Sequence, residues 1–358
     1  MKILVTALEP SANLYLKSLL PFFEKQNIQI AGIFDPALKE EFQNSNLELL
    51  ESSKNFSVMG VFAILPKIKF AKQIMKILVS KIEEFDHIFV IDSPAFNIPL
   101  IKKIREKNKD LPISYFILPK VWAWKKKRAE VINELVTNKI SIFPFEDKFF
   151  EKPLYFGNPL LEQIKEFKTE LKAENRVISF LAGSRKQEIK NLMPVFRSLK
   201  ERLKCSGRRF ILVIPQHFSE QEIREIYSDI SDFEIKRDTH SALLESDFSF
   251  ICSGTATLEA SIIGTPFILV YETSKLEYFI GRMFVKLEYV GLANIIFNYA
   301  ELGKFHDEVL QENLTADNLI NLMLRTNKKK FLENSEKIRE LLKNPINKNS
   351  FESIAELF

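Results

Sequence analysis

The stretch RVISFLAG at residues 176–183 decides the fold, because an almost unbroken apolar run ends in glycine and leads into a helical pattern over residues 187–204. A short apolar run with these flanks is typical of a strand buried on both faces of a parallel sheet. Similar runs follow it at RRFILVIP (208–215), DFEIKR (232–237), DFSFICSG (247–254) and TPFILVY (265–271). A helix between Glu220 and Asp229 is expected inside this series. The alternation predicts βαβ units.

The same pattern precedes this stretch. Expected strands are KILVTAL (2–8), IQIAGIF (28–34), FDHIFVID (85–92), PISYFIL (112–118), KISIF (139–143) and LYFG (154–157). The turn-forming residues Gly157-Asn158-Pro159 separate the two series. We therefore expect an α/β protein of two Rossmann-like domains, residues 1–158 and 159–326, facing across a cleft. Ligands of such sheets bind beyond the carboxyl ends of the strands.

The composition is that of an ordinary globular chain. Of 358 residues, 51 are Lys or Arg and 47 are Asp or Glu, and 46% are hydrophobic. The net charge of +4 is too small to indicate a nucleic-acid-binding protein, and the apolar content excludes extensive disorder. Two cysteines, Cys205 and Cys252, exclude a disulfide framework and indicate a reducing compartment.

No targeting or membrane-spanning segment is expected. The apolar run Ile3–Leu8 is too short for a signal peptide. No apolar stretch approaches the ~18 residues of a membrane-spanning helix. We therefore expect a cytoplasmic protein whose contact with a membrane is limited to its surface.

The turn Gly183-Ser184-Arg185 is a candidate phosphate site. Small residues allow close approach of the backbone, a helix N-terminus attracts anions, and the Arg185 guanidinium can grip a phosphate. The alternative is an ordinary strand-to-helix turn with a solvated arginine.

A second candidate is Ser253-Gly254-Thr255-Ala256-Thr257-Leu258-Glu259, which follows another strand. Its free N–H groups can form an anion site, and the Glu259 carboxylate, one turn into the helix, can accept ribose hydroxyls. The alternative is simple capping by Ser253 and Thr255, with Glu259 favouring the helix dipole.

The turn Asp92-Ser93-Pro94-Ala95-Phe96-Asn97 carries a candidate general base. An aspartate at the carboxyl end of a strand faces the expected cleft and can accept a hydroxyl proton. The alternative is an Asx turn before Pro94.

Two further segments are distinctive. Trp122 and Trp124, followed by the cations 125–128, suit stacking on a sugar or lipid, but core packing is the commoner use. Residues 52–82 contain six lysines and no acid, with Lys69, Lys72 and Lys76 on one helical face beside a wide apolar arc. This predicts an interfacial helix on a membrane, or alternatively an ordinary amphipathic helix packed on the sheet.

Several site classes lack support in the sequence. The four histidines are scattered, and no metal-ligand spacing is present. The chain has no Walker A sequence, no GxGxxG and no GxSxG.

Taken together, the segments resemble bacterial lipid-A-disaccharide synthases, glycosyltransferases of the two-domain glycosyltransferase-B type. The resemblance extends from Ala7 to about Gln311. Its motifs are DSPAFN (92–97), VWAW (121–124), FPFE (143–146), GNPL (157–160), GSRKQEI (183–189), SGTATLEA (253–260) and YVGLAN (289–294).

The resemblance implies an inverting transfer that joins UDP-2,3-diacylglucosamine to 2,3-diacylglucosamine 1-phosphate, giving UDP and a β(1→6) disaccharide 1-phosphate of lipid A biosynthesis. It implies that Asp92 and Arg185 are catalytic, without a metal or other cofactor. It also implies that the tail, about 327–358, completes the first domain, and that the enzyme is peripheral on the cytoplasmic face of the inner membrane through segment 52–82. Substrate or UDP contacts are implied for Glu9, Ser11, Asn97, Trp122, Gly183, Ser184, Ser253, Gly254, Thr255, Ala256, Thr257, Glu259 and Asn294.

The chain departs from the family pattern at several positions. The family's Gly-Glu-x-Ser-Gly-Asp run is Leu8-Glu9-Pro10-Ser11-Ala12-Asn13 here, Ala95 stands where a second Asp is common, and Asn158 replaces a usual His. Two alternatives stay open: another enzyme of this fold, such as a UDP-sugar 2-epimerase or a muramyl-lipid transferase, and a non-catalytic nucleotide-sugar-binding protein.

Overall fold

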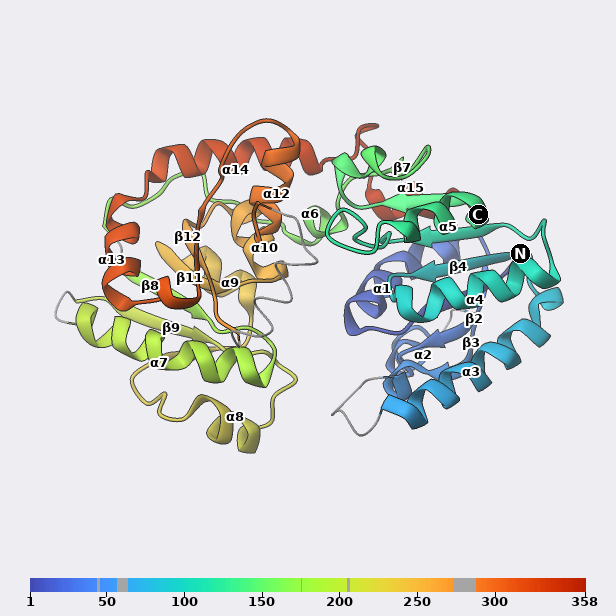
Figure 1. The fold of residues 1–358 in the computed structure, drawn as a ribbon, viewed down its shortest axis with the longest axis horizontal. Helices are drawn as coiled ribbons and strands as arrows, with labels where there is room; N and C mark the ends of the chain where they lie inside the picture. The colour runs from blue at the N-terminus through green and yellow to red at the C-terminus, as the bar shows by residue number, and fades with distance from the viewer. Residues whose placement is uncertain (44–45, 57–63, 175, 205–206, 274–287) are drawn as a thin grey trace. The chain divides into compact units, whose positions relative to one another are not determined.

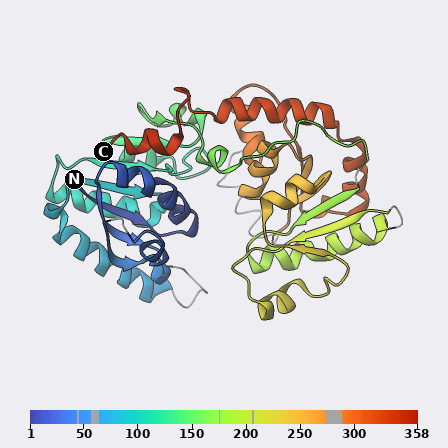
Figure 2. The same cartoon turned by 180° about the vertical axis from the view of Figure 1, so that it is seen from behind.

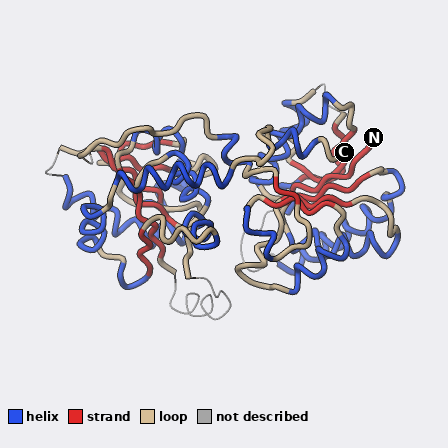
Figure 3. The backbone as a smooth tube through the Cα atoms, turned by 90° about the horizontal axis from the view of Figure 1, so that it is seen from above, coloured by secondary structure: helices blue, strands red, loops and turns tan. Residues whose placement is uncertain are grey.

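A computed structural model of the chain describes residues 1–43, 46–56, 64–174, 176–204, 207–273 and 288–358. The chain forms two compact units, Met1–Pro159 with Lys343–Phe358, and Leu160–Leu342. Each unit is a sheet with helices on both faces (Figure 3), as expected for two Rossmann-like domains.

The first unit contains a seven-stranded parallel sheet in the order β3-β2-β1-β4-β5-β6-β7. Its strands are β1 (Lys2–Ala7), β2 (Gln29–Phe34), β3 (Leu47–Ser52), β4 (His87–Ile91), β5 (Ile113–Phe116), β6 (Asn138–Ser141) and β7 (Leu154–Tyr155). Its helices are α1 (Pro10–Lys25), α2 (Ala37–Glu41), α3 (Ile64–Ser80), α4 (Pro94–Lys107), α5 (Lys127–Leu135) and α15 (Ser350–Ala355) (Figure 1).

The second unit repeats this design with six parallel strands in the order β10-β9-β8-β11-β12-β13. The strands are β8 (Val177–Leu181), β9 (Arg209–Val213), β10 (Glu234–Lys236), β11 (Phe248–Cys252), β12 (Phe267–Tyr271) and β13 (Asp307–Leu310). The helices are α6 (Pro159–Gln163), which begins at the junction, α7 (Lys186–Leu203), α8 (Glu220–Tyr227), α9 (Thr239–Glu245), α10 (Thr255–Ile263), α12 (Leu292–Tyr299), α13 (Ala316–Arg325) and α14 (Lys328–Leu342).

Both sheets reverse their strand order next to their first strand. In the first unit β1 pairs with β2 and β4, with Ala7 opposite Ile91. In the second unit β8 pairs with β9 and β11, with Leu181 opposite Ile251. Connections leave in opposite directions at these points, so each sheet has a crevice at its carboxyl edge.

Apolar periodicity explains how the helices pack. In α7 the residues Ile189, Leu192, Phe196, Leu199 and Leu203 are buried at spacings of three and four. They join the core of the second unit, where Phe180 stacks on Phe250 with ring centroids 5.6 Å apart. The chain contains 32 phenylalanines, and many of them are buried in the two cores.

The C-terminal tail returns to the first unit later than expected. Helix α14 belongs to the second unit, where it packs on α10, and the Phe331 ring lies 5.0 Å from that of Phe305. Only residues from Lys343 onward join the first unit. There α15 packs on α1, and the C-terminus lies near the N-terminus (Figure 2). The Phe358 ring packs edge-on against Phe23 and Phe89.

Candidate active site

Asp92 lies at the carboxyl end of β4, at the reversal point of the first sheet. Its backbone and that of Ser93 are left-handed, with φ of 50° and 46°. Such conformations cost about 1–3 kcal/mol each in non-glycine residues and cluster at functional sites. Burial raises the pKa of the Asp92 carboxyl, while the Ser93 N–H and the Lys120 cation act in the opposite direction. A carboxyl group whose pKa is raised in this way is suited to accept a proton.

Two buried side chains fix the backbone of Asp92. The Tyr115 hydroxyl and the Asn97 amide each donate a hydrogen bond to the Asp92 carbonyl oxygen, both at 2.7 Å. Thr6 in turn donates to Asn97 Oδ1 at 2.8 Å. Asn97 is fully buried, so the structure gives it a positioning role instead of the expected contact with substrate.

The altered loop after β1 is closed by Asn13. Its amide donates to the carbonyl oxygens of Ala7 and Glu9 at 2.8 and 3.0 Å, and its Oδ1 accepts from the Asp35 N–H. The loop is thus held without the glycines of the family pattern. Glu9 and Ser11 are exposed on it.

Glu9 is an electrostatic neighbour of Asp92. Although the residue is exposed as a whole, partial desolvation of its carboxyl raises the pKa of Glu9, and the charge of Asp92 raises it further. Glu9 follows β1 and Asp92 follows β4, which are paired strands. The first unit therefore gathers two acidic side chains at its reversal point.

The second unit places Gly183, Ser184 and Arg185 directly after β8. Gly183 has φ of 96°, and a Cβ there would lie 2.6 Å from Glu188 Oε2 and 3.1 Å from Cys252 Sγ. Glycine is therefore favoured at this position by the backbone conformation, and a larger residue would also displace the Glu188 side chain. Arg185 is exposed and donates to Glu188 Oε1 at 3.0 Å. Its guanidinium lies at the surface, beside the N-terminus of α7.

The neighbouring strand β11 leads into the second candidate anion site. Gly254 is the N-cap of α10, and no side chain in the described part of the protein caps α7 or α10. Ser253 and Thr255 therefore do not cap the helix as the alternative interpretation required. Thr255 and Gly254 are exposed, Ser253 and Ala256 are partly exposed, and Thr257 is buried and donates to the Gly254 carbonyl oxygen at 2.8 Å.

Glu259 faces a histidine that the sequence did not single out. His240 Nε2 lies 3.4 Å from Glu259 Oε2, and this contact raises the pKa of His240. His240 lies in α9, which packs on α10. Glu259 thus has a protein partner beside the candidate anion site.

Trp122 and Asn294 are not exposed to a ligand. Trp122 is 7% exposed, donates to Glu146 at 3.4 Å and packs edge-on against Phe143 and Phe145, so the core-packing interpretation holds. Asn294 is fully buried: its amide donates to the oxygens of His306 and Glu308, and its Oδ1 accepts from the N–H groups of Phe305 and His306. These hydrogen bonds hold the chain after α12. They use the donors and the acceptor of the Asn294 amide, so no hydrogen-bonding group of its side chain is left for UDP. Asn158, at the departure from the family's His, is likewise buried and donates to the Ile142 carbonyl oxygen.

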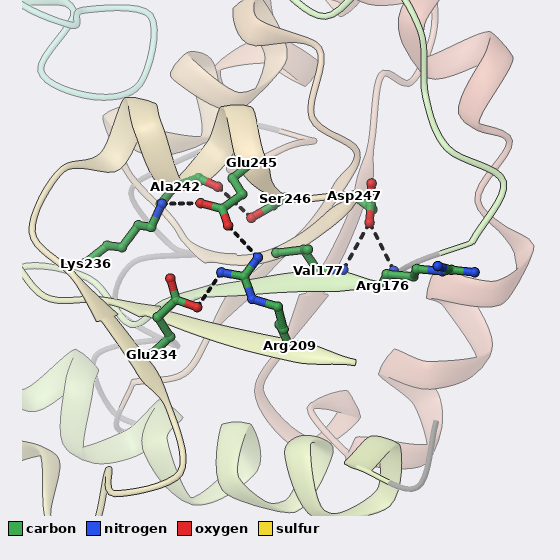
Figure 4. Close-up of polar contacts among 9 residues, drawn as sticks. All are labelled: Arg176, Val177, Arg209, Glu234, Lys236, Ala242, Glu245, Ser246 and Asp247. Carbon is green, nitrogen blue, oxygen red and sulfur yellow. Dashed lines mark hydrogen bonds and ion pairs between the residues drawn. The ribbon is translucent and has the colours of Figure 1, made fainter. Parts of the chain in front are cut away.

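The other end of the second sheet is occupied by ion pairs. Asp247 accepts from the N–H groups of Arg176 and Val177, both at 3.0 Å, and Arg209 bridges Glu234 and Glu245 (Figure 4). Asp247 thus binds backbone groups at the start of β8, and Arg209, at the start of β9, pairs with carboxylates at the start of β10 and the end of α9.

The structure describes only part of the basic segment 52–82. Residues 57–63 of the 52–82 segment lie outside the described residues. In α3, Lys69, Lys72 and Lys76 are exposed together with Ile68 and Ile77. The expected apolar arc is mostly used by the core, because Ile74, Met75, Leu78 and Ile82 are buried and Phe70 packs at 5.3 Å on Phe56.

Sequence reasoning missed Tyr115, Lys120, Ser93 and His240. Tyr115 and His240 carry no motif of their own, and only their neighbours in the fold reveal their roles. Ser93 lies inside a motif, and its buried hydroxyl has no partner among the described residues. Within the described ranges, no group of three His, Cys, Asp or Glu residues is placed to hold a metal, and no helix is long and apolar enough to cross a membrane.

Comparisons of the sequence with known proteins point to one family, and comparison with solved structures shows the fold. A family model described as lipid-A-disaccharide synthetase matches residues 3–358. Lipid-A-disaccharide synthase of Campylobacter jejuni (strain RM1221) is 42% identical over 351 residues, covering 95% of each chain. That of Helicobacter acinonychis (strain Sheeba) is 37% identical, covering 95% of this chain and 94% of the other. The calicheamicin glycosyltransferase CalG4 matches in fold, with a TM-score of 0.63 at 12% identity over 99% of this chain and 96% of that one.

Proposed function

The chain belongs to the lipid-A-disaccharide synthase family and is a glycosyltransferase that forms the lipid A disaccharide, and we propose that Asp92 is its general base and Arg185 its principal contact to the departing UDP. The proposed donor is UDP-2,3-diacylglucosamine and the acceptor is 2,3-diacylglucosamine 1-phosphate. The acceptor 6-hydroxyl attacks the donor's anomeric carbon, which inverts as the bond to UDP breaks. The hydroxyl proton passes to Asp92.

One observation supports this division of roles. The first sheet has carboxylates at its reversal point, and the second sheet has anion-binding groups at its own. Asp92 and Glu9 follow the central strands of the first sheet, and the turns at Gly183–Arg185 and Ser253–Thr257 follow those of the second. A carboxylate that accepts a proton belongs with the acceptor. Two adjoining helix N-termini and an arginine suit a diphosphate, whose charge grows as it leaves.

We assign the donor's UDP to residues that the structure leaves accessible: Gly183, Ser184, Ser253, Gly254, Thr255, Ala256 and Glu259. Glu259 is assigned to the ribose hydroxyls while it is paired with His240. Glu9 and Ser11 are assigned to the acceptor. Arg185 and the helix N-terminus can compensate the charge of the leaving group, so the proposed step does not require a metal.

Access to diacylated substrates requires a membrane surface, and we propose that α3 provides the contact. Its lysines 69, 72 and 76 are exposed on a helix that contains no acidic residue. Such a cluster is attracted to anionic lipids, and the exposed Ile68 and Ile77 can enter the interface. The enzyme would then be peripheral on the cytoplasmic face of the inner membrane.

The test is turnover by the Asp92→Asn variant. With both lipid substrates and a chelator present, the native chain should form the disaccharide 1-phosphate and UDP. The variant should bind UDP normally and lose about 10²–10⁴-fold in turnover, as for removal of a general base. Asp86→Asn, at a surface position before β4, is the matched control. Near-normal turnover by Asp92→Asn would remove Asp92 from this role.

A further inference from the structure

A groove beside Asp92 has no role in the mechanism so far. It has a volume of about 520 Å³ and lies between the first half of α4 and the turn that leads into α5. Pro94, Ala95, Ile98, Pro99 and Lys102 line it from α4, and residues 125–128 line it from the turn and the start of α5. This volume is within the range of about 300–1,000 Å³ that is typical of small-molecule sites.

The charge of the groove has a single sign. Five of its lining residues are cations, namely Lys102, Lys125, Lys126, Lys127 and Arg128, and none is acidic. Where the structure describes the chain, none of these cations forms an ion pair with a carboxylate; Lys125 and Arg128 lie over the Trp124 ring instead, at 4.3 and 5.6 Å. Cations without an acidic partner beside an apolar floor suit a ligand that is both anionic and partly apolar.

The groove adjoins the proposed base through covalent and hydrogen-bonded neighbours. Pro94, in its wall, is two residues after Asp92 and begins α4. Arg128 exerts an electrostatic effect on the Tyr115 hydroxyl, and that hydroxyl donates to the Asp92 carbonyl oxygen. The wall of the groove therefore begins two residues from the proposed proton acceptor.

We propose that this groove binds the phosphate monoester of the acceptor, with the start of an acyl chain on its apolar side. The inference rests on the proposed function, because it locates one part of the proposed acceptor. The 6-hydroxyl and the 1-phosphate belong to the same sugar ring, so a phosphate site must lie within one sugar of Asp92. The donor's diphosphate is assigned to the second unit, which leaves the acceptor phosphate as the anion for the first.

The test compares two acceptors in the Lys102→Gln/Lys126→Gln/Lys127→Gln variant. One acceptor is a short-chain diacylglucosamine 1-phosphate that is soluble without vesicles, and the other is the same molecule without its phosphate. The KM for the phosphorylated acceptor should rise about 10- to 100-fold, as for loss of charge-assisted hydrogen bonds. The KM for the donor and the KM for the dephosphorylated acceptor should not change.

The matched control is Lys103→Gln/Lys329→Gln/Lys337→Gln, which removes three exposed lysines that do not line the groove. It should keep the native KM values. An unchanged KM for the phosphorylated acceptor in the groove variant, or an equal rise for both acceptors, would overturn the proposal. So would loss of binding to phosphatidylglycerol vesicles with an unchanged acceptor KM, because the groove would then bind bilayer headgroups. Failure of the native chain to form any disaccharide would instead refute the proposed function.

Discussion

At the scale of single residues, the structure separates side chains that can meet a ligand from side chains that hold those in place. Asp92 is partly exposed, whereas Asn97 and Tyr115, which bind its carbonyl oxygen, are buried. All three lie near one turn, and Asn97 shares a sequence motif with Asp92. A motif identifies such a group as a whole, and burial then assigns the role of each member.

Lys120→Gln should move the acid limb of kcat/KM to higher pH. The base must be ionised to accept a proton, so activity falls as pH drops through the pKa of Asp92. Lys120 lowers that pKa, and its neutralisation raises it. The measurement is a pH profile with the native substrates, with Lys103→Gln as control. An unmoved acid limb would show that Lys120 does not act on the base.

Gly183→Ala should weaken UDP binding and cost more stability than a glycine substitution elsewhere. The new methyl group would approach Glu188 and Cys252 in a backbone conformation with φ of 96°. Gly303 has φ of 79° but nothing within 4 Å of an added Cβ, so Gly303→Ala is the control for backbone strain alone. Strain of this kind costs about 1–3 kcal/mol. Chemical denaturation measures the free energy of unfolding, and titration measures UDP affinity. If Gly183→Ala and Gly303→Ala lose equal amounts of both, the contacts at Gly183 are unimportant.

At the scale of elements, the sequence predicts the central strands better than the edges. Expected strands coincide with β1, β2, β4 and β8, because each is a run of apolar residues buried on both faces. Of the four edge strands, β7 and β10 were expected, but β3 (LELLES) and β13 (DEVL) were missed, because the charged residues in these two half-exposed strands hide the apolar pattern.

The sequence could locate the turns of the candidate site but not the state of each side chain within them. Trp122 and Asn294 belong to recognisable motifs. Trp122 nevertheless packs against Phe143 and Phe145. All hydrogen-bonding groups of the Asn294 amide are used by protein partners. Those partners come from other segments, and only the tertiary fold brings them together. His240 was missed for the same reason, because its partner Glu259 lies on the next helix.

The exposed face of α3 gives a prediction about membrane binding. Replacing Lys69, Lys72 and Lys76 by Gln should weaken binding to anionic vesicles, with about 1 kcal/mol lost per lysine. Lys103→Gln/Lys329→Gln/Lys337→Gln removes the same charge at exposed positions outside α3 and is the control. Vesicle sedimentation at two salt concentrations measures the effect. Equal binding by both triple variants would argue against a specific role for α3.

At the scale of the whole molecule, the same topology occurs twice and the chain closes the first unit with its last residues. Each sheet reverses beside its first strand, which is why the proposed proton acceptor in one and the proposed anion site in the other occupy equivalent places. The second unit is continuous in sequence, whereas the first is completed by Lys343–Phe358. The first unit should therefore depend on a segment far from the rest of it in sequence.

Phe351→Ala tests this dependence. Phe351 is 4% exposed in α15 and packs at 6.4 Å on Tyr15, so its loss should lower the free energy of unfolding of the first unit by about 3–5 kcal/mol. The second unit contains no part of this contact, so UDP affinity should persist at temperatures where turnover is lost. Ile346→Ala, at a side chain that is 62% exposed, is the control and should leave both unchanged. Simultaneous loss of UDP binding and turnover would mean that the two units unfold as one.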